Sequence, residues 1–378
     1  MDFCYICDCS LNVHNCSEEH IFLNALGGKL KARNLLCKQC NSMFGDDIDS
    51  ELARQFNFIA NMLNIERDRG KPQSFDAIDC QDGTVYSLEP GGIPVLKYPV
   101  IKKEVQETKT RFTIRARDVK QWRAVAKGLK RKYPEIEQNK TLTNISTTKK
   151  KKYLDNELSF KMEFGGVKAF RSLCKSAINF YLYKNGNIAN IRHLIPYVTG
   201  KFEDKQIVKP VYFGYDPISK NDSEVLHSII IKGDAHENLL YAYIELFNFY
   251  KILVLLNDNY TDDNIEYSYF FDVITRKEVI RDYQLILTKS NIKPIMDNIL
   301  FYKEMMRHLK VLLEKILRKQ DFEHRKALLT DAMNNVMKKY PDKKYLDEEM
   351  CKDTVNEVMK QLTPWLLHRL KQNKDYEL

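Results

Sequence analysis

Two pairs of closely spaced cysteines constrain the fold of this chain more than any other feature. Cys4 and Cys7 form one pair, Cys37 and Cys40 form the other, and 29 residues lie between the pairs. A two-residue spacing lets one tight turn present both thiolates to a single ion, and four thiolates satisfy a tetrahedral Zn²⁺. We therefore predict a structural zinc site that staples a segment too small to fold around its own core. The alternative is four unrelated thiols.

The other five cysteines stand singly along the chain. Cys9 and Cys16 are close enough to compete for the ion, but each lacks a partner at the two-residue spacing. Cys80, Cys174 and Cys351 are expected to be free thiols. The N-terminus has no basic start followed by an apolar stretch, and no apolar run approaches the roughly 18 residues of a membrane span. We expect a cytoplasmic protein with reduced thiols and no membrane association.

Polar residues at regular positions lie between the cysteine pairs and just after them. They are Glu19-His20, the double glycine Gly27-Gly28, Asn34 and Asn41. Together with the cysteines, the stretch EEHIFLNALGGKLKARNLLCKQCN resembles the HNH endonucleases in which two CxxC pairs bracket a ββα-metal active site. The resemblance covers residues 4–63, and it combines the zinc spacing with the catalytic spacing.

The resemblance implies a role for each polar residue. His20 would be the general base, since an imidazole with a pKa near ~6.5 can accept a proton from water at neutral pH. Glu19 and Asn41 would bind one catalytic Mg²⁺ or Mn²⁺ through hard oxygen ligands. Asn34 matches the middle asparagine of the motif, which orients the loop that carries the base. Asn24 is a second candidate for that role.

This sequence departs from the commonest pattern of the family at two positions. Asn41 stands where many members have histidine, which weakens metal binding and favours Mg²⁺ over softer ions. Leu23 stands where many have proline, which affects the stiffness of the loop.

The rest of the chain predicts an α+β protein with a small N-terminal ββα-metal zinc domain, a mixed α/β middle region and a helical C-terminal arm. We expect domains at 1–70, 73–290 and 293–378. Helical periodicity indicates helices from Asp46 to Asn64, over Val167–Tyr183 and over Glu237–Asn248. Strand patterns cover four further segments, namely Thr84–Leu88, Ile93–Val100, Val225–Lys232 and Ile252–Leu256.

Three helices are expected in the C-terminal arm. One apolar stripe runs to Leu317, a second helix covers Phe322–Tyr340, and a third starts near Leu346 with a break at Thr363-Pro364. Such an arm is most often structural packing, and dimerisation or binding of a protein partner is the alternative.

Charge is unevenly distributed along the chain. The net charge is +9, yet residues 1–70 contain seven Lys/Arg and ten Asp/Glu, so the remainder carries +12. A basic body would hold a polyanion while the metal site supplies the chemistry. The run Lys149, Lys150, Lys151 and Lys152 is a candidate phosphate contact, and a solvated surface loop is the alternative.

The leading hypothesis is a metal-dependent HNH endonuclease that nicks or cuts DNA. The resemblance alone suggests an effector of bacterial or phage genome defence, with a mobile-element nuclease as an alternative setting. A zinc-stabilised nucleic-acid-binding or regulatory protein with an inactive HNH fold is the second hypothesis. Cleavage of RNA is the third, because nothing in the motif distinguishes the two sugars.

Overall fold

The computed structural model describes residues 3–106, 109–133, 153–297, 301–341, 345 and 347–374. The chain divides into two compact units, one made of residues 1–73 and 162–317 and the other of residues 74–161 and 318–378. Within them the expected α+β architecture with a helical C-terminal arm is confirmed. The expected division into functional domains at 1–70, 73–290 and 293–378 stays a prediction.

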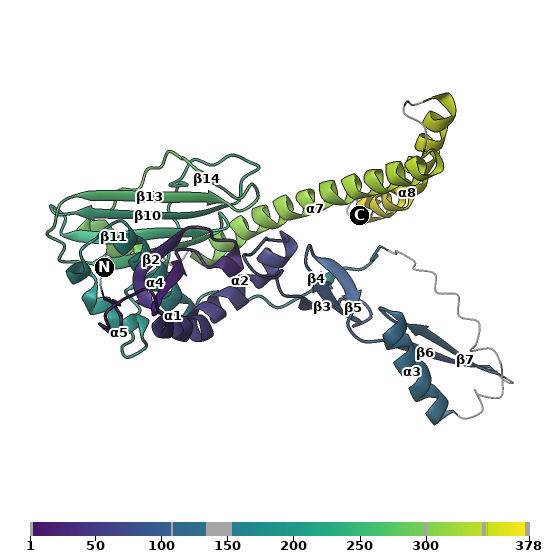
Figure 1. Ribbon diagram of the computed structural model, residues 1–378, viewed down its shortest axis with the longest axis horizontal. Coiled ribbons are helices and arrows are strands. Elements are labelled where there is room, and N and C mark those ends of the chain that lie inside the picture. Colours follow the sequence, from purple (N-terminus) through teal and green to yellow (C-terminus); the bar gives the residue numbers. More distant parts are fainter. Residues whose placement is uncertain are drawn as a thin grey trace. The chain divides into compact units, whose positions relative to one another are not determined.

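The N-terminal part of the first unit is a hairpin followed by a helix (Figure 1). Strand β1 (Cys16–His20) pairs antiparallel with β2 (Lys31–Cys37), and a 3-10 turn η1 (Asn24–Leu26) lies between them. The chain then continues helically through α1 (Lys38–Phe44), the π-helical turn η2 (Gly45–Asp49) and α2 (Ser50–Met62). This is the expected ββα order, and the predicted helix from Asp46 to Asn64 is confirmed as η2 and α2.

A six-stranded antiparallel sheet forms the body of the first unit, in the order β14-β13-β10-β11-β12-β9. Its strands are β9 (Val208–Pro210), β10 (Leu226–Asp234), β11 (Leu239–Leu246), β12 (Tyr250–Asn257), β13 (Ile265–Asp272) and β14 (Lys277–Val279). Every residue of β11 is buried. The predicted helix over Glu237–Asn248 is therefore wrong. A segment that is apolar at every position has no periodicity to distinguish helix from strand.

Helix α4 (Val167–Tyr183) is the central helix of the first unit. It contacts β2, η2 and α2 on the zinc-domain side and β9 to β12 on the sheet side. Most of its residues are buried, including Ser172, Lys175 and Asn179. The described part of the unit also contains four short helices, η5 (Ile188–Asn190), η6 (Arg192–Leu194), α5 (Ile195–Val198) and α6 (Lys289–Met296), and residues 301–317 of the long helix α7 (Phe301–Lys339).

Aromatic side chains join α2, the helix that follows the N-terminal hairpin, to the sheet. Phe56 of α2 lies with its ring centroid 5.2 Å from Tyr250, 5.9 Å from Phe249 and 6.1 Å from Phe247. Phe164 adds a fourth neighbour at 5.3 Å. Aromatic rings at these separations contribute attraction beyond the area that they bury. The zinc domain is therefore held to the sheet by a shared core.

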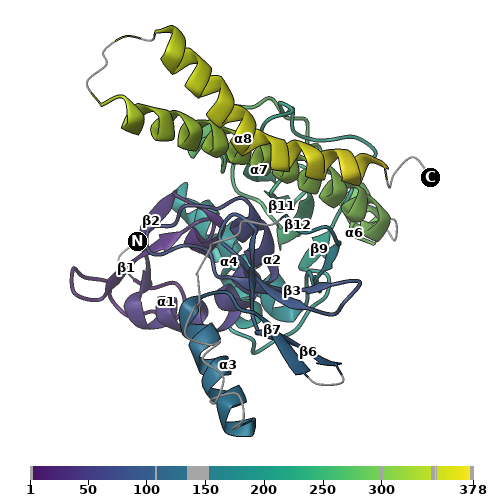
Figure 2. The ribbon, with the colours of Figure 1, turned by 90° about the vertical axis from the view of Figure 1, so that its right-hand side faces the viewer.

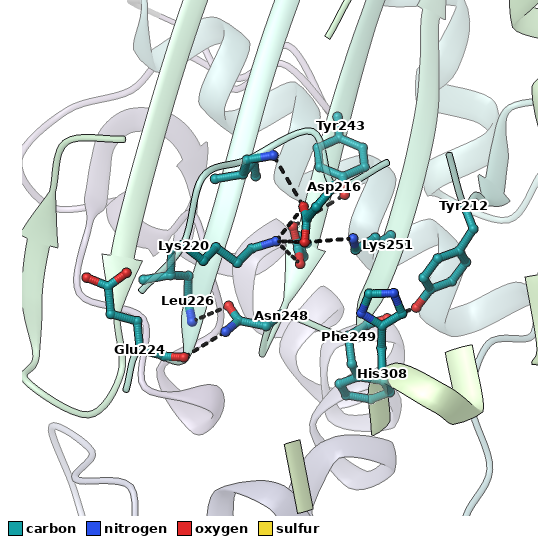
Figure 3. A network of polar contacts seen from close by, with 12 residues as sticks. Tyr212, Asp216, Lys220, Glu224, Leu226, Tyr243, Asn248, Phe249, Lys251 and His308 are labelled. Carbon is teal, nitrogen blue, oxygen red and sulfur yellow. Dashed lines mark hydrogen bonds and ion pairs between the residues drawn. The ribbon is translucent and has the colours of Figure 1, made fainter. Parts of the chain in front are cut away.

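A polar network on the strands β11 and β12 fixes the loop that precedes β10 (Figure 3). Lys220 Nζ lies 2.7 Å from Asp216 and 2.9 Å from the fully buried Glu245, and Lys251 Nζ lies 3.3 Å from Asp216. The Tyr243 hydroxyl donates to Glu245. Two carboxylates thus face two ammonium groups, which is the balance that burial of charge requires.

The second unit contains two small sheets and, towards the C-terminus, two helical segments, residues 318–339 and Glu348–Lys374. The first segment continues a long helix that begins in the first unit. A four-stranded sheet has the order β5-β4-β3-β8, from β3 (Phe75–Asp79), β4 (Val85–Glu89), β5 (Ile93–Leu96) and β8 (Leu158–Ser159). The hairpin of β6 (Val100–Gln106) and β7 (Lys109–Arg115) is followed by α3 (Val119–Lys132).

The long helices are α7 (Phe301–Lys339) and α8 (Glu348–Lys374), which lie antiparallel (Figure 2). Polar contacts of Asn335 with Glu357 and of Asp321 with Arg369 hold them together. The predicted break at Thr363-Pro364 is wrong, as is the boundary near Phe322. Pro364 removes only one backbone hydrogen bond, and pairing with α7 keeps α8 continuous. Among the described helices none is both long and apolar enough to span a membrane.

Candidate functional site

Several thiols converge at the N-terminus. The chain turns back after Cys4, because Cys4 N–H donates to Cys9 O at 2.9 Å and Asp8 adopts a φ of 55°. The sulfur atoms of Cys4, Cys7, Cys9 and Cys37 all lie within 4.8 Å of one another, and Cys7 and Cys37 are 3.8 Å apart. Zn–S bonds of about 2.3 Å in a tetrahedron place sulfurs about 3.8 Å apart. The thiols therefore fit a zinc ion.

The predicted ligand set differs from this cluster at one position. Cys40 was expected as the fourth ligand, and the mutually close group contains Cys9 in its place. Cys40 is nevertheless adjacent, since its backbone N–H donates to the Cys37 sulfur at 3.4 Å and its own thiol contacts those of Cys4 and Cys7. Five thiols thus lie around one position, and the choice of Cys40 stays a prediction.

The hairpin presents alternate residues of β1 to opposite faces. Glu18 and His20 lie on the exposed face, opposite Arg33 and Lys31 of β2, whereas Glu19 lies on the buried face. Glu18 makes an ion pair with Arg33. The sequence motif Glu19-His20 therefore does not bring its two side chains to one surface of the strand.

His20 has a carboxylate partner that sequence analysis missed. Its Nε2 lies 3.2 Å from Asp68 Oδ2, and Lys29 and Lys31 reach the same carboxylate at 2.8 and 3.0 Å. These contacts, with that of Lys29 first, hold the pKa of Asp68 below its ordinary value, so it is ionised and can only accept. Nε2 of His20 therefore carries the hydrogen, and Nδ1 carries the lone pair. Burial lowers the pKa of His20, which keeps the imidazole neutral near pH 7.

Asn24 holds the loop that carries this arrangement. Its side-chain oxygen accepts the Asp68 backbone N–H at 3.0 Å, and its amide donates to Gly28 O. The double glycine is required here: Gly27 has a φ of 97°, and a Cβ at Gly28 would lie 1.8 Å from a backbone oxygen. Asn34 instead accepts a hydrogen bond from the Cys16 thiol at 3.0 Å. Its expected role in orienting the loop stays a prediction.

His227 of β10 fixes the same loop from the sheet. Its Nε2 donates to Leu26 O at 2.9 Å, and its ring lies 5.1 Å from Phe22 and 4.4 Å from Phe247. The residue is fully buried, and burial lowers its pKa to about 4. No motif in the sequence indicates this contact, because 201 residues separate the partners.

Asn41 is positioned by the zinc cluster. The Cys37 thiol caps the N-terminus of α1, and Asn41 follows Cys40 in the first turns of this helix. The Asn41 amide donates to Glu18 O at 3.3 Å, which ties the helix to β1. A metal-binding role for Asn41 stays a prediction.

Glu19 belongs to a buried ion cluster with α4. The Lys175 ammonium, which is fully buried, pairs with Glu19 Oε1 and with Asp49 Oδ2. Asn179 also donates to Glu19 Oε1, and Ser172 donates to Asp49 Oδ1 at 2.6 Å. Burial opposes the charged ammonium, but attraction to Glu19 and Asp49 outweighs it and raises the pKa of Lys175.

This pairing bears on the predicted catalytic ion. A carboxylate that already holds an ammonium does not fit a divalent ion in the same conformation, since the two cations would repel. The ligand role of Glu19 stays a prediction, and it now requires that Lys175 move aside. Sequence analysis missed Asp49 and Lys175, although the polar residues at 172, 175 and 179 recur at helical spacing on one face of α4 and were a signal. The run Lys149–Lys152 lies outside the described residues.

Comparison with known proteins agrees with the sequence motif. A family model described as HNH endonuclease matches residues 4–57, which cover the thiol cluster, the hairpin and most of α2. Searches among curated proteins and among solved structures each gave no match. The predicted resemblance is confirmed, and the family supports nuclease chemistry at a general level. Residues 4–57 of this chain are an HNH-type domain.

Proposed function

We propose that the chain is a metal-dependent HNH endonuclease that hydrolyses phosphodiester bonds of DNA, with His20 as the general base. The observation that carries the proposal is the pairing of His20, which lies within the segment that matches the family, with Asp68 on the exposed face of the hairpin. A fully buried histidine without a carboxylate partner on an exposed face would contribute to packing only.

His20 and Asp68 divide the work of proton transfer. Asp68 accepts from Nε2 and thereby directs the lone pair of Nδ1 outward, where it takes a proton from the attacking water. The same carboxylate stabilises the imidazolium that forms. Lys29, Lys31 and Arg33 lie beside this pair and contribute positive potential for a phosphate group.

Mg²⁺ or Mn²⁺ is the cofactor expected from the family, and it would stabilise negative charge on the phosphate and on the leaving oxygen when bound. The roles of His20 and Asp68 do not depend on which residues hold that ion. The zinc ion, by contrast, is structural, because four thiolates leave no open position for substrate. The proposed setting, an effector of bacterial or phage genome defence, rests on the family resemblance.

One observation favours the alternative of a nucleic-acid-binding protein with an inactive HNH fold. The carboxylate expected to bind the catalytic ion is already paired with Lys175. A plasmid-nicking assay distinguishes the two functions, run with Mg²⁺, with Mn²⁺ and with chelator, and repeated on labelled RNA.

We expect the parent protein to nick plasmid with a divalent ion and His20→Ala to be slower by about 10²-fold or more. Asp68→Asn should fall between the two. His14→Ala, which removes an exposed histidine of the same domain, is the matched control and should behave as the parent. Absence of nicking with every ion, in a folded and zinc-loaded protein, would establish the binding protein instead. Cleavage confined to RNA would correct the substrate.

A further inference from the structure

The most basic segment of the chain lies far from the HNH domain in sequence. Residues 100–132 contain twelve Lys/Arg against three Asp/Glu, which gives a net charge of +9, as large as that of the whole chain. This segment forms the β6–β7 hairpin and α3 in the second unit. The positive charge that sequence analysis attributed to the body as a whole is therefore concentrated on two adjacent elements.

Helix α3 contacts the hairpin through the residue at its C-terminal end. The rings of Phe112 in β7 and Tyr133 at the end of α3 have centroids 5.0 Å apart, and Lys103 of β6 donates to the Tyr133 hydroxyl. Ala126 is buried, and Val125 and Leu129 are half-buried. The apolar side of the helix is thus partly removed from solvent.

The opposite side of α3 carries a row of exposed cations. Lys120, Arg123, Lys127 and Arg131 follow one another at spacings of three, four and four residues, which places them on one helix face. The row extends over about 16 Å of helix axis. None of the four forms an ion pair with another residue in the described part of the chain, whereas neighbouring Arg117 pairs with Asp118 and Lys97 with Asp76.

Stability of the helix does not explain this row. Arg123 and Lys127, and again Lys127 and Arg131, are like charges four residues apart, and each such pair destabilises a helix by a few tenths of a kcal/mol. Acidic side chains three or four residues from these cations would have stabilised the helix. The unmatched cations fit a partner that supplies closely spaced negative charges.

We propose that this row, Lys120, Arg123, Lys127 and Arg131, binds the phosphate backbone of the substrate nucleic acid at a surface separate from His20. The identity of the partner rests on the proposed function, because a nuclease domain in the same chain acts on a polyphosphate. A membrane surface fits less well, since a helix that lies on lipid must insert an apolar face, and on α3 Ala126 is buried and Val125 and Leu129 are half-buried. The row contacts phosphates and reads no sequence.

The test compares two full-length proteins that each lose four positive charges. One has Lys120, Arg123, Lys127 and Arg131 replaced by Gln, and the other has four exposed cations of α7, Lys303, Arg318, Lys326 and Lys338, replaced by Gln. Both carry His20→Ala and are measured with chelator, so that no cleavage occurs. Binding to a 30-base-pair duplex is followed by fluorescence anisotropy from 50 to 300 mM salt.

We expect the α3 protein to bind at least about tenfold more weakly at 100 mM salt, with the slope of log K against log salt reduced by about 3 to 4. The α7 protein should match the parent. Equal weakening in both proteins, or no change in either, would overturn the proposal. Binding of the same proteins to anionic vesicles is measured in parallel, and a loss of vesicle binding by the α3 protein without a loss of DNA binding would overturn it too. Circular dichroism should show α3 intact, since the Gln residues remove repulsion.

Failure of this proposal and failure of the proposed function give different results. If the protein does not cleave DNA, binding through α3 is still measured in the anisotropy experiment. If α3 does not bind DNA, the nicking assay with unmodified His20 still reports cleavage.

Discussion

At the scale of single residues, the ammonium of Lys175 is the most consequential group that the structure adds to the motif. It connects the strand residue Glu19 to Asp49 of the helical run and comes from α4, a different part of the chain. Two carboxyl groups share one ammonium away from water, and burial raises the pKa of Glu19 above its ordinary value. Ser172 and Asn179 supply further hydrogen bonds to the two carboxyl groups. The cluster is therefore sensitive to loss of any member.

We expect Lys175→Met to destabilise the protein by about 3 to 5 kcal/mol, because it leaves two buried carboxylates without a counter-charge. Urea unfolding at pH 7.5, followed by circular dichroism, measures the loss. Lys168→Met is the matched control on the same helix: Lys168 pairs with Asp47 but is more than half exposed, so its loss should cost under about 1 kcal/mol.

The same variant examines the metal-binding role predicted for Glu19. If Glu19 can hold a divalent ion once Lys175 is gone, millimolar Mg²⁺ or Mn²⁺ should restore part of the lost stability, by about 2 to 3 kcal/mol at a hundredfold excess over Kd. The parent should respond less. Equal responses would show that Glu19 serves only as the partner of Lys175, and equal stability of the two Met variants would contradict the buried cluster itself.

The fourth zinc ligand is also decided at this scale. Cys40 is buried and follows the Cys37 cap in the first turn of α1, whereas Cys9 is half-exposed on the N-terminal loop. We expect Cys40→Ser to lose most of its zinc and Cys9→Ser to keep one ion per chain, as measured by atomic emission after dialysis against a weak chelator. The reverse result would assign the site to Cys4, Cys7, Cys9 and Cys37.

At the scale of elements, the sequence predicts those helices that have one apolar face and one polar face. α2 is recognisable because Leu52, Phe56 and Ile59 recur at helical spacing among polar residues. β11 is not recognisable in this way. Leu239, Tyr241 and Tyr243 enter one core cluster, and the alternate residues Leu240 and Ala242 are buried as well. A strand buried on both faces has no polar alternation to reveal its period.

The candidate site was predictable to the extent that its chemistry is local. The cysteine spacing, His20 and the double glycine lie within 37 residues, so their proximity follows from one hairpin and one helix. Lys175 is 156 residues from Glu19, and His227 is 201 residues from Leu26. Such pairs depend on how the sheet packs against the hairpin, which spacing along the chain does not determine.

Strand β10 contacts the loop of the HNH domain through His227, which bonds to Leu26 O. Burial lowers the pKa of His227 to about 4, below its ordinary value near 6.5, so the unfolded chain binds its proton more tightly than the folded protein does. The contribution of the neutral His227 to the free energy of unfolding is fully present above about pH 6.5, and it is lost as the pH falls from 6.5 towards 4.

We expect this residue to account for about 2 kcal/mol of the stability lost between pH 7.5 and pH 5. His227→Phe keeps a ring but cannot titrate. At pH 7.5 the variant should have a lower free energy of unfolding than the parent, because the Leu26 carbonyl is left unpaired. The difference between the two proteins should shrink by about 2 kcal/mol between pH 7.5 and pH 5. Urea unfolding at half-unit pH steps measures the two curves. Parallel curves would show that His227 does not titrate in this window.

At the scale of the whole molecule, the first unit is assembled from two stretches of chain with residues 74–161 inserted between them. Both ends of the insertion are attached to α2. Gln73 bonds to Asn57 and Asn61 at 3.2 and 2.9 Å, and Gly165 exchanges two hydrogen bonds with Gln55 at 2.8 Å. Residues 55 and 61 are about 9 Å apart along the helix, so the ends of the insertion are close together.

This arrangement predicts that the HNH domain needs the sheet but not the insertion. Residues 1–73 alone would expose Phe56 and leave Glu19 and Asp49 without Lys175, so we expect this fragment to be unfolded by circular dichroism even with zinc. A chain in which about six Gly/Ser residues, which reach roughly 13 Å, replace 74–161 and which ends at Leu317 should fold cooperatively and bind one zinc ion. It should also lose the salt-dependent DNA binding assigned to α3 while it keeps any nicking activity. If fragment 1–73 folds alone, the domain does not need α4 and the sheet for its stability. If the chain without residues 74–161 cannot bind zinc, the domain needs the insertion.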